Sequence, residues 1–387
     1  MAARSWPVCA IAGEIKMIDR RQFCGGLLLG SLGAMLPAGA SSPRTVTDMA
    51  GRTVRLAAAP KRIVLLEARD IVVMDLLHPD PAALVVGWAG VDRIDSGLLQ
   101  ARFERDRKIP VIGRQTPDTI GLEALLNLAP DLVVASTYMA PLSDGSLFDR
   151  LEKIGIPVVF SDVSSNAASQ VRAGPIENLH RHMRMWGEIL DAGDRAAAFL
   201  AFADEHLGYV AQRVATAPAV TTYLEVQSTL DDCCWAAGKQ VWGELLALAG
   251  GKPLPAVTAP WFQKLQLEYL LTTPHDVYIA SGGGWSSGGR PAIGPGIDLA
   301  QGREGLRRLV ARPGFANLAS VRHQRVHGIW TGLITIMPLS ILFVEIVAKW
   351  LHPELFPDLD PAQTVADINR RFFSAPIDGP LWVSIQE

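Results

Sequence analysis

The residues best suited to chemistry in this sequence lie close together in one stretch, Gly113 to Tyr138. It reads GRQTPDTIGLEALLNLAPDLVVASTY, with an arginine in a turn, an acid in a leucine-rich helical pattern and a tyrosine after an apolar run. Arg114 and Tyr138 suit an anionic, partly apolar ligand, because guanidinium groups pair with anionic oxygens and aromatic rings cover apolar surface. Glu123 either stabilises the start of its helix or serves in docking.

A second stretch repeats this pattern. Leu122 to Ser136, LEALLNLAPDLVVAS, and Leu267 to Ser281, LEYLLTTPHDVYIAS, have the same length and share Leu, Glu, Leu, Leu, Asp, Ala and Ser at matching places. The leucine spacing turns Glu123 and Glu268 outward from their helices. The repeat predicts two lobes of like topology and favours a shared docking role for the two glutamates.

Further candidates come from loop position. In open α/β sheets, ligands gather outside the carboxyl ends of the strands, and exposed aromatic residues in such loops need a partner. Trp261 precedes the second repeated helix, as Arg114 precedes the first. The other candidates in strand-end loops are Arg69, Trp88, Trp235, Trp285, Arg290 and Trp330.

The whole chain alternates short apolar runs with helical patterns, which predicts an α/β fold with mainly parallel sheets. A continuous helical pattern from Ile176 to Val214 separates two such regions and predicts one long backbone helix between two Rossmann-like lobes, with the ligand cleft between them. The expected parts are a signal peptide at 1–40, an N-terminal lobe at 41–172, the linking helix at 173–215 and a C-terminal lobe at 216–387.

The first 40 residues have the composition of an export signal. Arg20 and Arg21 precede Phe23 and a short apolar run, and a small-residue site follows at 38–40, as in a twin-arginine signal. Met17 is an alternative start to Met1. The mature chain is therefore expected in the periplasm.

Two neighbouring cysteines remain after the signal. Cys233 and Cys234 are either two buried thiols, which we favour, or one partly reactive pair. The sequence leaves their redox state open.

Several functions find no support. A net charge of −3 and scattered basic residues argue against nucleic-acid binding. No metal-ligand cluster, catalytic triad or phosphate loop is found, so we expect no metal site, no catalytic residue and no enzyme activity. The apolar stretch Leu339 to Leu351 contains Glu345 and Lys349 and is expected to be a core helix.

Taken together, the segments resemble periplasmic substrate-binding proteins of ABC importers for ferric siderophores, haem and cobalamin. The resemblance rests on TVTDMAGRTVRLAAAPKRIVLL, GLEALLNLAPDLVVAS, LFDRLEKIGIPVVFSD, GDRAAAFLAFADEHL and VWGELLALAGGKPLPA. It implies two lobes joined by a long helix, with Glu123 and Glu268 meeting arginines of the permease. Ferric hydroxamate binders of the family have ligand residues in the places of Arg114, Tyr138, Trp261 and Trp330.

The expected function is capture of an iron complex, a ferric siderophore, and its delivery to an inner-membrane ABC permease and its ATPase. The protein is expected to be a monomer without a cofactor. Two departures from the family pattern concern the cleft: the end of the chain extends past the usual final helix, and the loop at 282–302 is long. The alternatives are haem or cobalamin as ligand, or a chelatase or iron reductase on the same scaffold.

Overall fold

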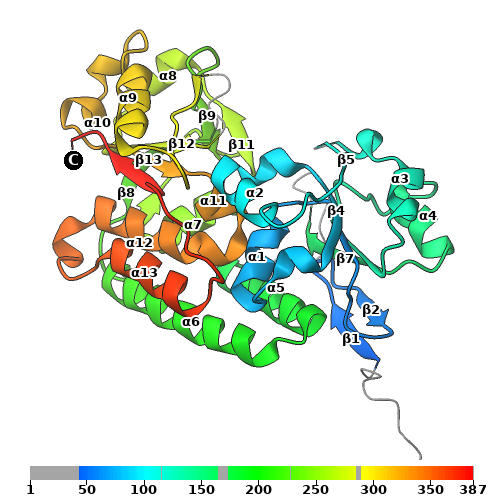
Figure 1. The fold of residues 1–387 in the computed structure, drawn as a ribbon. Helices are drawn as coiled ribbons and strands as arrows, with labels where there is room; N and C mark the ends of the chain where they lie inside the picture. The colour runs from blue at the N-terminus through cyan, green and yellow to red at the C-terminus, as the bar shows by residue number, and fades with distance from the viewer. Residues whose placement is uncertain (1–42, 115, 164–172, 227, 285–288, 387) are drawn as a thin grey trace, which may run out of the picture. The chain divides into compact units, whose positions relative to one another are not determined.

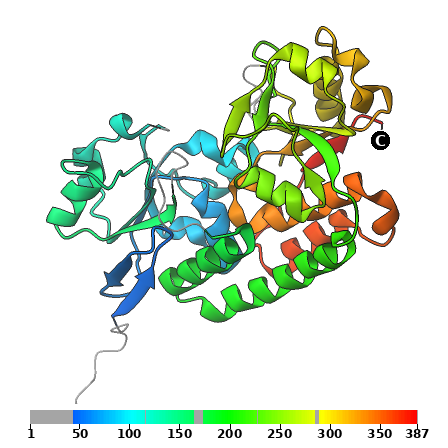
Figure 2. The same ribbon diagram turned by 180° about the vertical axis from the view of Figure 1, so that it is seen from behind.

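The computed structural model describes residues 43–114, 116–163, 173–226, 228–284 and 289–386. The expected signal at 1–40 and the candidate Trp285 lie outside these residues. The described chain contains two large sheets with surrounding helices, called here the N-lobe (43–163) and the C-lobe (219–386), and a separate two-stranded sheet in the N-lobe. Figure 1 and Figure 2 show them from opposite sides.

The N-lobe is built on a five-stranded sheet with the order β5-β4-β3-β6-β7, in which every neighbouring pair is parallel. Most of its strands are short apolar runs, as expected for parallel strands buried on both faces. The strands are β3 (Ile63–Leu65), β4 (Val85–Ala89), β5 (Val111–Gly113), β6 (Leu132–Ser136) and β7 (Val158–Asp162), preceded by the hairpin β1 (Arg44–Thr47) and β2 (Thr53–Leu56). The helices are α1 (Asp70–Leu77), α2 (Gly97–Phe103), α3 (Leu122–Asn127) and α4 (Leu147–Lys153).

The C-lobe has a mixed sheet with the order β11-β9-β8-β12-β13-β14, and β10 also pairs with β8. Its centre, β8, β12 and β13, is parallel, whereas β9, β11 and β14 join antiparallel. The strands are β8 (Val220–Glu225), β9 (Trp235–Ala237), β10 (Gly251–Lys252), β11 (Phe262–Lys264), β12 (Val277–Gly282), β13 (Val326–Trp330) and β14 (Trp382–Ser384). The helices are α7 (Trp242–Leu248), α8 (Leu267–Thr272), α9 (Leu299–Val310), α10 (Ala319–Arg322), α11 (Gly332–Thr335), α12 (Ser340–Leu351) and α13 (Pro361–Arg371).

The expected single backbone helix is wrong: two helices, α5 (Pro175–Leu190) and α6 (Gly193–Val214), lie between the lobes in the sequence. The helix ends because Asp191 adopts the left-handed conformation, with φ 58°. The two helices then pack against each other, and a Cβ placed on Gly187 would lie 2.9 Å from the Cβ of Ala196. Gly187 therefore serves close helix packing within a helical hairpin.

The hairpin contacts both lobes. Helix α5 packs on α1 and β1 of the N-lobe, and α6 packs on α12 and α7 of the C-lobe. Arg195 of α6 adds polar contacts, donating to the carbonyl of Leu76 at 2.7 Å and to that of Phe372 at 2.6 Å. The connection between the lobes is thus anchored on both of them.

Helix α12 is a core helix, as the sequence predicts. Ten of its residues are buried, among them Glu345. One oxygen of Glu345 lies 2.6 Å from Nδ1 of His206 on α6, so this buried acid has a partner. No helix in the described part of the chain is long and apolar enough to cross a membrane.

The two repeated units occupy equivalent places in their sheets. Helix α3 leads into β6, which lies beside the first strand of the N-lobe sheet, β3. Helix α8 leads into β12, which lies beside the first strand of the C-lobe sheet, β8. The two lobes therefore share a local topology around the repeat, as predicted.

The end of the chain, which extends past the usual final helix of the family pattern, adds a strand to the C-lobe sheet. After α13, residues Trp382–Ser384 form β14, which pairs antiparallel with β13 and closes that edge of the sheet. The segment before β14 also reaches the N-lobe, because Arg102 of α2 donates to the carbonyls of Ala375 and Pro376, both at 2.7 Å. The extension thus touches both lobes.

Candidate ligand-binding site

The carboxyl edge of the N-lobe sheet is organised around Glu67, two residues past β3. Its side chain is fully buried and accepts hydrogen bonds from Ser136 Oγ at 2.6 Å and from Arg93 Nη1 at 2.6 Å to each oxygen. Arg69 Nη2 lies 3.8 Å from the same carboxylate. Because a buried polar group without partners is costly, these donors offset the burial of the Glu67 side chain.

Arg69, a predicted ligand residue, lies at the start of α1, and its side chain is mostly buried. Its Nη2 is 2.9 Å from Asp162 at the end of β7.

Two buried groups near Arg69 have shifted pKa values. Burial raises the pKa of Asp70 to about 7, although Ser161 Oγ donates a hydrogen bond to that carboxyl at 2.5 Å. Burial also lowers the pKa of His182 to about 3, so this histidine is neutral at physiological pH.

Tyr138 lies just past β6, as the sequence predicts, and the residue is 36% exposed. The guanidinium carbon of Arg93 is 5.9 Å from the centre of its ring, within the range of a cation–π contact. Arg114 lies past β5 and is exposed, and its backbone amide donates to Thr119 Oγ1 at 2.8 Å. Tyr138 and Arg114 therefore both lie on the N-lobe, but they follow β6 and β5, which are separated in the sheet by β3 and β4.

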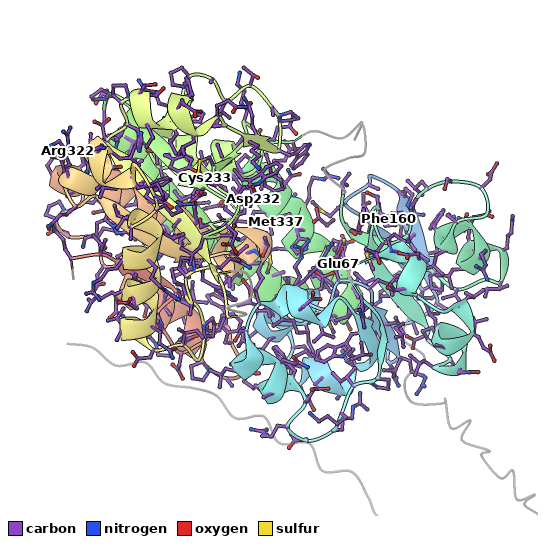
Figure 3. The ribbon with its side chains drawn as sticks, turned by 90° about the horizontal axis from the view of Figure 1, so that it is seen from above. Glu67, Phe160, Asp232, Cys233, Arg322 and Met337 are labelled. Atoms are coloured by element: carbon purple, nitrogen blue, oxygen red, sulfur yellow. A yellow bond between two sulfur atoms is a disulfide. The ribbon has the colours of Figure 1, made fainter. Side chains whose placement is uncertain are left out.

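Trp235 marks the corresponding edge of the C-lobe. It is the first residue of β9, opposite the end of β8, because Val226 donates to its carbonyl at 2.9 Å. Its indole Nε1 donates to Asp232 at 2.9 Å, and Lys264 Nζ lies 5.6 Å from its ring while also pairing with Asp232. Figure 3 labels Glu67 in the N-lobe and Asp232 in the C-lobe.

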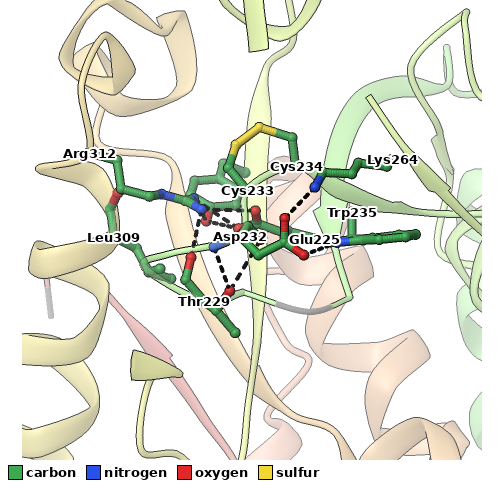
Figure 4. The surroundings of a disulfide bond; sticks show 10 residues. Glu225, Thr229, Asp232, Cys233, Cys234, Trp235, Lys264, Leu309 and Arg312 are labelled. Carbon is green, nitrogen blue, oxygen red and sulfur yellow. Dashed lines mark hydrogen bonds and ion pairs between the residues drawn. A yellow bond between two sulfur atoms is a disulfide. The ribbon is translucent and has the colours of Figure 1, made fainter. Parts of the chain in front are cut away.

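The preference for two buried thiols is wrong, because Cys233 and Cys234 form a disulfide with each other. The bridge lies directly before Trp235 and beside Asp232, as Figure 4 shows. Bridging neighbouring residues requires an unusual backbone, and Cys234 has a φ of 116°, a conformation that non-glycine residues rarely adopt. The sequence shows that the two cysteines are neighbours, but it does not predict the unusual backbone conformation of Cys234.

Two tryptophans predicted in strand-end loops are instead fully buried. Trp88 lies inside β4, which continues to Ala89, and its ring belongs to the apolar core. Trp330 is the last residue of β13, and its indole Nε1 donates to the carbonyl of Asp95 at 3.1 Å. Neither ring is exposed, so neither tryptophan lies in an open strand-end loop.

Arg290 and Trp261 are less buried than Trp88 and Trp330. Arg290 Nη2 donates to Thr331 Oγ1 at 2.8 Å and lies 3.6 Å from Asp95, so it bridges the C-lobe and the N-lobe. Trp261 is partly buried before β11, and its carbonyl accepts from Gly238 N at 2.6 Å. Thus Arg290 joins Trp330 in the contact with Asp95.

The two predicted docking residues are both exposed. Glu123 lies in the first turn of α3 and Glu268 in the first turn of α8. Because each glutamate lies in the first turn, its carboxylate is also near the positive end of the helix dipole. Their exposure and equivalent positions are compatible with either a docking or a helix-stabilising role.

Two buried acids, Glu67 and Glu225, were not singled out from the sequence. Glu67 lies two residues past β3 in RIVLLE, and Glu225 ends β8 in TTYLE, so Leu-Glu stands at the end of both apolar runs. Glu225 is fully buried and bound by Arg312 at 3.0 and 2.9 Å, and by the hydroxyl of Tyr278 at 2.5 Å. An acid at the end of an apolar strand in both halves was the available signal.

Among the described residues, no group of three or more His, Cys, Asp or Glu side chains is arranged to hold a metal ion. A shallow groove of about 600 Å³ lies on the helical hairpin, between α5 and α6. It is separate from both sheet edges, and its lining residues include His180, Arg184, Glu188 and Asp204.

Comparison with known proteins identifies the class. Residues 74–329 match the family model described as periplasmic binding protein, so the chain belongs to the periplasmic binding protein family. The family and the related structures below are solute-binding proteins. A search of curated proteins finds no match.

Solved structures share the fold. The TroA-like periplasmic binding protein FepB from Veillonella parvula has 21% identity and a TM-score of 0.77, covering 89% of this chain and 100% of that one. The molybdate periplasmic binding protein MolA from Haemophilus influenzae has 18% identity and a TM-score of 0.67, covering 87% and 99%. An ABC-type Fe3+-hydroxamate transport protein from Saccharomonospora viridis has 21% identity and a TM-score of 0.57, covering 80% and 99%.

The buried ion pair of the C-lobe yields a stability prediction. Burial raises the pKa of Tyr278 well above its ordinary value, so its hydroxyl stays protonated and donates to Glu225. Replacing Arg312 with Met removes the main charge partner of Glu225, and should lower the free energy of unfolding by about 3–5 kcal/mol. Urea denaturation measures this loss.

The matched control is the double variant Glu225→Gln with Arg312→Met, which leaves no buried charge and should lose clearly less stability. A single variant within about 1 kcal/mol of the parent protein would contradict the paired role of Arg312.

Proposed function

We propose that this periplasmic binding protein captures an iron complex, a ferric siderophore, and delivers it to an inner-membrane ABC permease with its ATPase. The observation that carries the proposal is an aromatic ring beside a cation at the carboxyl edge of each sheet. Tyr138 lies beside Arg93 in the N-lobe, and Trp235 lies beside Lys264 in the C-lobe. Rings and cations together suit a bulky, partly apolar ligand with anionic oxygens.

The fold alone does not identify the ligand, since similar structures are named for molybdate and for Fe3+-hydroxamate. The proposal therefore rests on the chemistry of the two edges. Molybdate is small and has no apolar surface, and it would leave the Tyr138 and Trp235 rings unused. A ferric siderophore has both apolar surface and anionic oxygens around its metal, so it would use rings and cations alike.

In this proposal the iron is cargo within its chelate. The protein acts as a monomer, has no cofactor of its own and catalyses no reaction. The ligand would be held between the two lobes, with Trp261 and Arg290 near it. Because Trp88 and Trp330 are fully buried, the proposal takes Tyr138 and Trp235 as the principal aromatic contacts.

We further propose that the chain is exported by the twin-arginine route, on the basis of Arg20 and Arg21 before the apolar run. Changing both arginines to Lys should stop export of the full chain into the periplasm. Unchanged export measured by cell fractionation would sink this route.

Ligand binding can be followed by intrinsic tryptophan fluorescence, since Trp235 is partly exposed. The protein is titrated with ferric hydroxamate, ferric catecholate, haem and cobalamin. A ferric siderophore should quench or shift the emission at micromolar concentration, and the Trp235→Phe variant should show a smaller change. Saturable binding of haem or cobalamin alone, or no response to any of the four, would reject the siderophore assignment.

Docking is tested separately by charge reversal. The double variant Glu123→Lys with Glu268→Lys should keep its ligand affinity, because both residues are exposed on helices rather than at the strand-end loops. It should lose ligand uptake and the stimulation of ATP hydrolysis by the importer. The matched control reverses the exposed Glu152 of α4 and Glu205 of α6 and should transport normally. Full transport by the docking variant would refute the role.

A further inference from the structure

Arg93 lies at the carboxyl edge of the N-lobe sheet, on a short 3-10 helix, η2 (Val91–Ile94), directly after β4. Left-handed residues bound this turn on both sides, Gly90 with φ 61° and Asp95 with φ 53°. The chain therefore turns sharply at each end of η2 and brings Arg93 over the ends of β3 and β6, where Glu67 and Ser136 lie.

The guanidinium of Arg93 is anchored at one end only. Its Nη1 donates to both oxygens of Glu67 at 2.6 Å, and Glu67 is itself fixed by Ser136 Oγ at 2.6 Å. Because Glu67 is fully buried, this anchor is shielded from water and salt. A guanidinium held in this way loses little further freedom when it binds a ligand.

The Arg93 side chain is only partly buried. Within the described part of the chain, Nε and Nη2 of Arg93 make no hydrogen bond, and the side chain is 23% exposed. Its guanidinium carbon is 5.9 Å from the ring centre of Tyr138, a residue that is 36% exposed. Two N–H donors and an aromatic ring are thus available side by side.

The other two arginines of the N-lobe edge are less well placed. Arg69 is engaged with Asp162 at 2.9 Å and is more buried, with a side chain 15% exposed. Arg114 is exposed, and its hydrogen bond to Thr119 comes from the backbone amide. Only Arg93, of these three, combines a buried anchor with open donors beside Tyr138.

We propose that Arg93 is the residue of the N-lobe that binds the anionic oxygens of the ligand, through Nε and Nη2, while the ligand covers the Tyr138 ring. This assignment rests on the proposed function and transfers to Arg93 the role that the sequence gave to Arg114. Since Glu67 balances the charge of Arg93, recognition depends on the direction of the two donors as well as on charge. Ligands with paired oxygens, such as hydroxamates and catecholates, match the pair of donors that Nε and Nη2 of Arg93 provide.

The test compares variants of the mature protein by isothermal titration calorimetry, with a ferric trihydroxamate and a ferric tricatecholate as probes. Arg93→Gln should weaken binding of the preferred probe at least about tenfold, because charge-assisted hydrogen bonds are lost. Arg93→Lys keeps a positive charge beside Glu67 but loses the planar fork, and should weaken binding by about fivefold. The matched control Arg105→Gln, which changes an exposed arginine of the same lobe, should stay within about twofold.

The outcomes separate the inference from the proposed function. A parent protein that binds neither probe overturns the proposed function, and the role of Arg93 falls with it. A parent that binds, with Arg93→Gln and Arg93→Lys binding equally well, overturns the role of Arg93 alone. If Arg93→Gln fails to fold, as judged by circular dichroism, Arg93→Lys decides, and affinity equal to that of the parent rejects the proposal.

Discussion

The structure depends on burying one carboxylate at the end of the first strand of each lobe. A buried carboxylate is stable only when charged or hydrogen-bonding donors surround it, so Glu67 and Glu225 dictate where their partners lie. Glu67 brings together Ser136 after β6 and Arg93 after β4, and Glu225 brings together Arg312 and Tyr278. In both lobes, segments far apart in the sequence are thereby fixed at or near the end of the central strand.

The contacts between the lobes determine what remains available for a ligand. The backbone carbonyl of Asp95 accepts from the Trp330 indole at 3.1 Å and from Gly284 N at 3.0 Å, and Arg290 lies near its carboxylate. Two residues expected to bind a ligand are therefore used in joining the lobes. Arg93 lies two residues before Asp95, so the proposed ligand contact and the contact between the lobes are adjacent in the sequence.

The sequence was informative where a local pattern decides the structure. Alternating apolar runs predicted the parallel strands, and the repeated LE units predicted α3 with β6 and α8 with β12. It was less informative where long-range packing decides. Asp191 breaks the helical pattern through its backbone conformation, and Trp88 and Trp330 are buried because neighbouring segments cover the strand ends. The pairing of Glu67 with Arg93 depends on the fold, although Leu-Glu at both strand ends hinted at the acids.

The central claim is that a ferric complex lies on the N-lobe edge, over Tyr138 and within reach of Arg93. Crystals of the mature protein grown with a ferric tricatecholate or trihydroxamate, measured at the iron absorption edge, test it most directly. The account predicts an anomalous iron peak next to Tyr138, with ligand oxygens at hydrogen-bonding distance from Nε and Nη2 of Arg93. An iron peak at another place, such as the groove between α5 and α6, would contradict it.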